Sequence, residues 1–226
     1  MIVGHPPVRV ALRISPHARR LSLRISRIDG HVTLTCPGSV PRSEAVAFAE
    51  SREAWLRRHL ARVGEAEHPR LGGTVPFEGR DLPLVAGAVR AATLRDGALM
   101  LPDEPERVSP RVEAFLRAEA RNRLVAACDR HSAALGRPFR RITLRDVRSR
   151  WGSCSSRGDL MFSWRLVMAP PDVLDYVAAH EVAHLERMDH SPAFWAVVAR
   201  LCPDHREQRR WLRDRGGQLH RMKFST

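Results

Sequence analysis

The sequence predicts an α+β fold, and three observations lead to this class. The chain has 226 residues, of which 43% are hydrophobic and 28% charged, so it can bury a core and is too apolar to be disordered. Apolar and polar residues alternate in short segments of the first half, as in VRVALRI at 8–14, which is typical of strands. The second half is mostly helical, because apolar residues recur there at helical spacing behind capping residues.

The N-terminal part begins with strands. We expect them at 8–14, 21–25 and 31–35, and the turn dipeptide Asp29-Gly30 predicts that the last two form a hairpin. A helix is expected from Ser43, a good N-cap, to about Val63, because the apolar positions between these residues roughly fit a period of 3.6. This segment therefore resembles a small sheet with one helix.

Signals for short strands continue after this helix. They lie near Val75 and at 82–85, 89–94 and 98–101, and Asp96-Gly97 is a second hairpin signal. The stretch 102–110 is rich in proline and acidic residues and is typical of a linker. We therefore expect a β-rich N-terminal portion with one helix over residues 1–108 and a second portion over residues 109–226.

The second portion is expected to consist mainly of helices. Ser109-Pro110 predicts the start of a helix, and Gly136 predicts its end near Leu135. Two strands are expected at 142–147 and 160–164, with a polar loop at 149–158 between them. Further helices are expected at 172–185, 192–201 and 204–215.

The helix expected at 172–185 contains the motif His180-Glu181-Val182-Ala183-His184. Residues four apart on an α-helix project from one face, so both imidazoles can reach one metal ion. Glu181 lies beside this face, where a carboxylate can take a proton from a metal-activated water. Alternatively the two are surface histidines, because HExxH also arises by chance. The motif favours one Zn²⁺ ion per chain, bound by His180 and His184.

His190 is the candidate for a third ligand. It lies ten residues after His180 and just before Ser191, the expected cap of the next helix. Catalytic zinc needs three protein ligands and one open position, and His190 meets this need if the chain turns back after Leu185. Metzincins have the same spacing, but Arg187 stands where they have the glycine of a sharp turn, so we reject that assignment. By itself, His190 would be interpreted as a loop histidine beside a cap.

Residues near the motif are candidates for substrate binding. Four arginines lie in or beside the polar loop and its two strands: Arg148, Arg150, Arg157 and Arg165. They can hold an extended peptide or an anionic group, or they can lie on a solvated strand face. Tyr176 lies one turn before the first histidine of the motif, where it can steady an oxyanion; a packed tyrosine is the plainer interpretation.

Long segments of the sequence carry a family pattern. They are RDVRSRWGSCSSRGDLMFSWRLVMAP at 145–170 and LDYVAAHEVAHLERMDHSPAFW at 174–195. With these segments the chain resembles the YgjP-like metallopeptidases, relatives of the SprT and WLM zincins, over nearly its whole length. The resemblance implies a zincin-like catalytic portion, zinc ligands at His180, His184 and His190, and a catalytic Glu181. HEVAHL here replaces the commoner HELxHL, which is a mild apolar change.

Three functions are compatible with these residues. The leading hypothesis is zinc-dependent hydrolysis of a peptide bond, with Glu181 as the general base. The first alternative is a metal-dependent nucleoside triphosphate hydrolase, in which arginines hold the phosphates, although the chain lacks a P-loop. The second alternative is a nucleic-acid-associated protein with a structural zinc, although no helix-turn-helix, RRM or C₂H₂ pattern is present.

The net charge of +13 bears on the partner. Lys223 is the lysine of the chain and every other basic side chain is an arginine. The excess indicates either an anionic partner or an arginine-rich surface without further meaning. We therefore expect a peptide or protein substrate, or a nucleotide, and keep association with nucleic acid as an open alternative.

Cysteine usage and the N-terminus bear on the compartment. None of the four cysteines forms a CxxC pair, and such scattered cysteines do not resemble a disulfide framework. The N-terminus lacks the apolar run of a signal peptide, and no run of 18 apolar residues predicts a membrane span. The expected location is the cytoplasm, without a membrane partner.

Overall fold

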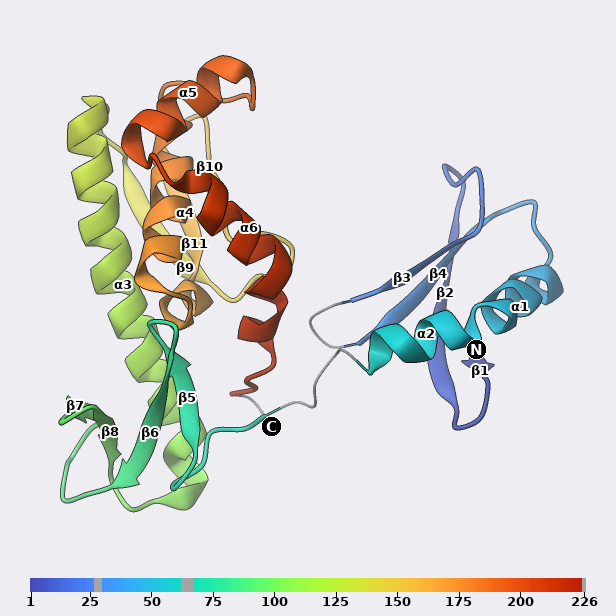
Figure 1. The fold of residues 1–226 in the computed structure, drawn as a ribbon, viewed down its shortest axis with the longest axis horizontal. Helices are drawn as coiled ribbons and strands as arrows, with labels where there is room; N and C mark the ends of the chain where they lie inside the picture. Colours follow the sequence, from blue (N-terminus) through green and yellow to red (C-terminus); the bar gives the residue numbers. More distant parts are fainter. Residues whose placement is uncertain (27–29, 62–66, 225–226) are drawn as a thin grey trace. The chain divides into compact units, whose positions relative to one another are not determined.

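The computed structural model describes residues 1–26, 30–61 and 67–224. The chain forms two compact units, Met1–Ala66 and Glu67–Thr226, and both contain helices and sheets, which confirms the α+β class (Figure 1). The division between the units lies well before the boundary expected after residue 108. The reason is that the strands between 74 and 101 share one core with the helices that follow them.

The first unit is a four-stranded sheet with helices packed on it. Its strands are β1 (Ile2–Val3), β2 (Val8–Ser15), β3 (Ser22–Ile25) and β4 (Val32–Pro37), in the order β1-β2-β4-β3. β3 and β4 pair antiparallel, which confirms the expected hairpin, while its turn residue Asp29 lies outside the described residues. β2 pairs with β4 in parallel.

The helix expected at 43–63 is interrupted. It forms α1 (Arg42–Ser51) and α2 (Glu53–Leu60), which meet at Arg52, and the expected end at Val63 lies outside the described residues. Arg52 is the residue between them, with φ −105° and ψ 11°, outside helical geometry. Side chains of both helices join the buried residues of the sheet in the core of this unit: Val3, Val10, Val32, Leu34, Cys36, Ala45, Ala49 and Leu56.

The second unit begins with another four-stranded sheet. Its strands are β5 (Thr74–Phe77), β6 (Arg80–Ala86), β7 (Thr93–Arg95) and β8 (Ala98–Leu101), in the order β5-β6-β8-β7. Asp96 and Gly97 have φ values of 50° and 74°, so they form the tight hairpin turn that the sequence predicts between β7 and β8. Leu84, Leu99 and Leu101 are fully buried in the core shared with the later helices.

The segment expected as a linker leads directly into the longest helix. A 3₁₀ turn, η1 (Pro105–Arg107), is followed at once by α3 (Val108–Leu135), which ends at Gly136 with φ 70°. Ser109 does not cap this helix, because it lies inside it and its hydroxyl donates a hydrogen bond of 3.0 Å to the carbonyl of Phe224. The linker prediction was wrong. The segment forms a 3₁₀ turn and the first residues of α3, and Val108 is buried in the core.

A three-stranded sheet and the remaining helices complete the second unit. The sheet has the order β10-β11-β9, with β9 (Arg141–Arg145), β10 (Gly152–Cys154) and β11 (Asp159–Ser163). β10 lies within the segment expected as a polar loop. After the 3₁₀ turn η2 (Trp164–Met168), the helices are α4 (Pro171–Ala183), α5 (Pro192–Leu201) and α6 (His205–Arg215), followed by the 3₁₀ turn η3 (Gly216–His220).

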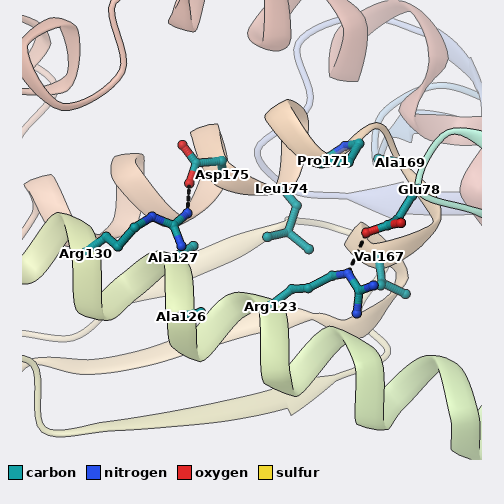
Figure 2. A pocket seen from close by; sticks show the side chains of 10 residues that line it. All are labelled: Glu78, Arg123, Ala126, Ala127, Arg130, Val167, Ala169, Pro171, Leu174 and Asp175. Carbon is teal, nitrogen blue, oxygen red and sulfur yellow. Dashed lines mark hydrogen bonds and ion pairs between the residues drawn. The ribbon is translucent and has the colours of Figure 1, made fainter.

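α4 lies at the centre of the second unit. It runs beside α3 and contacts α5, α6 and β10 (Figure 1). A hollow between α3 and α4 is bordered by ion pairs, which Figure 2 shows: Arg123 with Glu78 at 2.6 Å and Arg130 with Asp175 at 2.9 Å. The pair of Arg130 and Asp175 adds a polar contact between α3 and α4, and the pair of Arg123 and Glu78 joins α3 to the turn between β5 and β6. Within the described part of the chain, no helix is long and apolar enough to cross a membrane.

Candidate metal centre

Three histidines converge at the C-terminal end of α4. His180 lies in its last turn, and His184 is the residue that ends it, still with helical backbone angles. Their rings lie 5.1 Å apart, as the spacing of four residues predicts. His190 comes from the loop before α5, and its Nε2 lies 3.3 Å from Nε2 of His180. One ring nitrogen from each of the three lies within 4.8 Å of the others, so the expected ligand set is brought together.

The loop that carries His190 is held by its own hydrogen bonds. A carboxylate oxygen of Asp189 accepts bonds from the backbone nitrogen and the hydroxyl of Ser191, at 3.2 and 2.8 Å. The Ser191 hydroxyl in turn accepts from the backbone nitrogen of Phe194 and so caps α5. The Phe194 ring stacks on the His184 ring with centroids 4.5 Å apart. The start of α5 therefore both turns the chain back and supports the histidines.

The donor atoms fit a metal ion. Tetrahedral zinc with Zn–N bonds of about 2.0–2.1 Å places its nitrogen ligands roughly 3.3–3.4 Å apart, and the nitrogens of His180 and His190 already have this separation. Nδ1 of His184 lies 2.9 Å from the Arg187 carbonyl, an acceptor, which leaves Nε2 for a metal. Burial, with smaller effects of His184 and His190, lowers the pKa of His180 to about 3, so His180 is neutral, as a ligand must be.

Glu181 faces the same cleft as the histidines. Its side chain is buried, at 5% exposure, and burial raises its pKa to about 8, while the charge of Arg150 acts in the opposite direction. The cleft is formed by this end of α4, the His190 loop and β10, and its lining consists of Gly152, Ser153, Cys154, His180, Glu181, His184, Met188 and His190. A buried carboxylate beside three imidazole nitrogens can exchange a proton with a bound water.

Arg165 does not belong to the cleft, which corrects its expected role in substrate binding. Its guanidinium is buried and donates to both carboxylate oxygens of Asp146, at 2.7 and 2.9 Å. It also donates to the carbonyls of Leu219 and Met222, at 2.9 and 2.8 Å. All these partners are protein groups, so Arg165 fastens the last turn of the chain to the core.

The other expected substrate residues have different positions. Arg150 lines a groove next to the cleft. Arg148 and Arg157 are exposed and do not line this groove. Tyr176 is buried with its ring 6.0 Å from that of His180, and burial raises its pKa to about 12, so it stays protonated and packs beside the ligand.

Sequence reasoning missed two residues beside the centre. Gly152 lies against the carboxylate of Glu181. The sequence indicates this position only by placing a glycine directly after Trp151 in the RWGSCS segment. Arg209 of α6 lies over the Trp195 ring at 4.6 Å, and Trp195 lies 5.6 Å from the His180 ring. Nothing local in the sequence indicates Arg209, because α6 reaches the site only through tertiary packing.

Comparison with known families identifies the chain. A family described as YgjP-like, metallopeptidase domain, matches residues 19–215. The chain belongs to the YgjP-like family. The match includes the three histidines and Glu181, so membership in this metallopeptidase family implies a metal at the centre described above.

Other similarities of this YgjP-like chain are more distant. No curated protein matches it significantly. Among solved structures, the crystal structure of the metallopeptidase zymogen of Pyrococcus abyssi abylysin is similar to part of it. The two share 19% sequence identity over 41% of this chain and 95% of that chain, with a TM-score of 0.38.

Proposed function

We propose that this YgjP-like protein is a zinc-dependent peptidase in which Glu181 is the general base. The observation that carries the proposal is the convergence of three histidine nitrogens beside a buried carboxylate in one cleft. Among the described residues, no fourth His, Cys, Asp or Glu donor joins this set. Three protein ligands and an open position are typical of catalytic zinc, whereas structural zinc has four protein ligands.

The residues of the cleft have separate tasks in the proposed reaction. His180, His184 and His190 would hold the ion, which when bound acts as a Lewis acid and lowers the pKa of a bound water to about 7. Glu181 accepts a proton from the attacking water and returns it to the nitrogen of the leaving amine. Burial raises the pKa of Glu181, which helps the carboxyl group to hold the proton of the attacking water until the second transfer.

β10 supports a peptide as the substrate. It is an edge strand of its sheet, and all three of its residues line the cleft. An extended peptide can therefore pair with the free edge of β10 through main-chain hydrogen bonds and place its backbone at the metal centre.

The decisive test replaces Glu181 by glutamine. Glu181→Gln keeps the size of the side chain and removes its ability to accept a proton, so we expect cleavage of casein or a peptide library to fall by at least about 100-fold. Elemental analysis should show unchanged zinc content, because Glu181 is not a ligand. Glu106→Gln, a change at an exposed carboxylate in η1, is the matched control and should retain full activity. Wild-type activity of zinc-loaded Glu181→Gln would overturn the proposal.

A nucleoside triphosphate hydrolase is the second candidate, and the groove that contains Arg150 is the observation that favours it. Arginines recognise phosphates well, and the same metal centre could act on a phosphoanhydride. Phosphate release from a panel of nucleotides, measured beside the peptide assay with the same Glu181→Gln variant, distinguishes the two candidates.

A further inference from the structure

A groove on the second unit runs next to the metal cleft. It is lined by residues of β9, β10, β11 and the loop before β10, among them Thr143, Arg145, Arg150, Ser153, Cys154 and Asp159. Ser153 and Cys154 line the metal cleft as well, so the two depressions meet at β10. We propose that this groove binds acidic side chains of an extended peptide, which makes Asp- and Glu-rich peptides the substrate class; the proposal rests on the peptidase function proposed above.

The register of the sheet shows which face the groove occupies. Ser153, Met161 and Thr143 are paired across the three strands and form one row. The neighbouring row contains Leu160 and Ile142, of which Leu160 is in the core and Ile142 packs against it. Since successive residues of a strand point to opposite faces, the row with Ser153 and Thr143 lies on the outer face, away from the core.

An extended peptide paired with β10 would also alternate its side chains. One set would point toward the metal cleft, and the other set would point toward the outer face of the sheet. The groove begins at β10 on that outer face. Because β10 is three residues long, about one or two side chains of the paired peptide would meet the groove, and the lining of the groove would select them.

The lining is cationic and rich in hydroxyl groups. The carboxylate in the lining of the groove, Asp159, is already paired with Arg141 at 2.9 Å and with Arg140 at 3.8 Å. Arg145 and Arg150 are exposed, and among the described residues the structure gives neither an ion pair. This differs from the hollow between α3 and α4, where the arginines are paired with Glu78 and Asp175 (Figure 2). The groove therefore has positive charge that a carboxylate of a ligand can complement.

Arg150 connects the charge of the groove with the reactive centre. It precedes β10 by two residues and lines the groove together with Ser153, which also lines the metal cleft. A substrate carboxylate at Arg150 would thus lie near the scissile bond, whereas Arg145 on β9, which β11 separates from β10, would add positive charge farther along the groove.

Binding can be measured without cleavage. Full-length zinc-loaded Glu181→Gln protein is titrated into fluorescently labelled extended peptides that carry Glu, Gln or Lys at alternate positions. We expect the Glu peptide to bind about ten-fold more tightly than the Gln peptide at low salt, and less so at high salt. Adding Arg145→Gln and Arg150→Gln should remove most of this preference. Arg90→Gln with Arg95→Gln removes the same charge at exposed positions elsewhere on the second unit and should leave the preference intact.

Each outcome decides the proposal. Equal affinity for the Glu and Gln peptides, a preference that survives the loss of Arg145 and Arg150, or no binding at millimolar concentration would overturn it. It would also be overturned if a nucleoside triphosphate displaced the Glu peptide at far lower concentration than a second acidic peptide. Charge-selective binding without cleavage of any peptide by the wild-type protein would contradict the peptidase function and leave the groove assignment standing. A thermal unfolding measurement on every variant tests whether the variant is folded.

Discussion

Gly152 of β10 packs directly against the carboxylate of Glu181. A Cβ atom at Gly152 would lie 2.5 Å from Oε1 and 2.6 Å from Cγ of Glu181, closer than real Cβ contacts allow. The absence of a side chain at this position therefore determines how far the carboxylate can lie toward β10. Glu181 reaches its place in the cleft because its neighbour on the sheet is a glycine.

Gly152→Ala should disable the centre without removing its metal. The added methyl group displaces the Glu181 carboxylate or the strand, and loss of a positioned general base lowers the rate by about 100-fold or more. The measurements are peptide cleavage and zinc content, and zinc should remain bound because no histidine changes. Gly38→Ala is the control, because a Cβ there meets nothing within 4 Å. Gly152→Ala with wild-type activity would show that the contact has no functional role.

His190→Ala should release the metal even though it lies in a loop. The variant leaves His180 and His184 as ligands, and two imidazoles do not complete a catalytic zinc site. We expect less than stoichiometric zinc after dialysis and a smaller rise in melting temperature on adding zinc, because bound metal stabilises the folded state. His68→Ala, at an exposed histidine outside the cluster, should bind zinc as the wild type does. Full zinc occupancy of His190→Ala would remove His190 from the ligand set.

Arg165→Met should destabilise the second unit strongly. The change leaves the buried carbonyls of Leu219 and Met222 and the partly exposed carboxylate of Asp146 without their donor, and a buried acceptor without a hydrogen bond costs about 1–3 kcal/mol. Urea unfolding measures the loss. Arg141→Met breaks the exposed pair with Asp159 and should change the free energy of unfolding by about 1 kcal/mol at most. A similar small effect at Arg165 would contradict the role assigned to it.

The same ion pair predicts how stability depends on pH. Burial raises the pKa of Asp146, but the hydrogen bonds and charge of Arg165 lower it by more, so the folded-state pKa lies below 3.8. A depressed carboxylate pKa stabilises the fold above the unfolded-state value, and this contribution is lost as the pH falls through the folded-state value. The difference in unfolding free energy between the wild type and Asp146→Asn should therefore be constant near neutral pH and shrink below about pH 4. A difference that is independent of pH would contradict this.

The cluster of His180, His184 and His190 could be predicted from the sequence because its geometry is local. The spacing of His180 and His184 becomes a distance once the segment is a helix, and the cap at Ser191 explains why His190 can turn back. Arg165 could not be predicted in this way. Arginine is seldom fully buried unless it is paired, and its partners are 19, 54 and 57 residues away in sequence.

The extent of each unit was also beyond sequence patterns. The alternation in 74–101 predicts strands but does not say which core they join, and the structure places them with α3 and α4. β10 was missed because GSC is short and lacks the β-branched residues that indicate a strand. The loop assignment at 149–158 was therefore wrong for residues 152–154, which line the cleft, and confirmed for the residues on either side of them.

The packing of β5–β8 has a consequence for how the second unit unfolds. Leu84 and Leu99 share their core with the helix that carries His180, and the backbone nitrogen of Glu78 donates to the Val167 carbonyl at 2.8 Å. Amides of β6 and of α4 should therefore exchange with deuterium through the same cooperative opening. A fragment that starts at residue 109 would expose one side of this core, whereas a proteolytic cut at 102–107 should leave two pieces that stay associated and dissociate only when the whole unit opens.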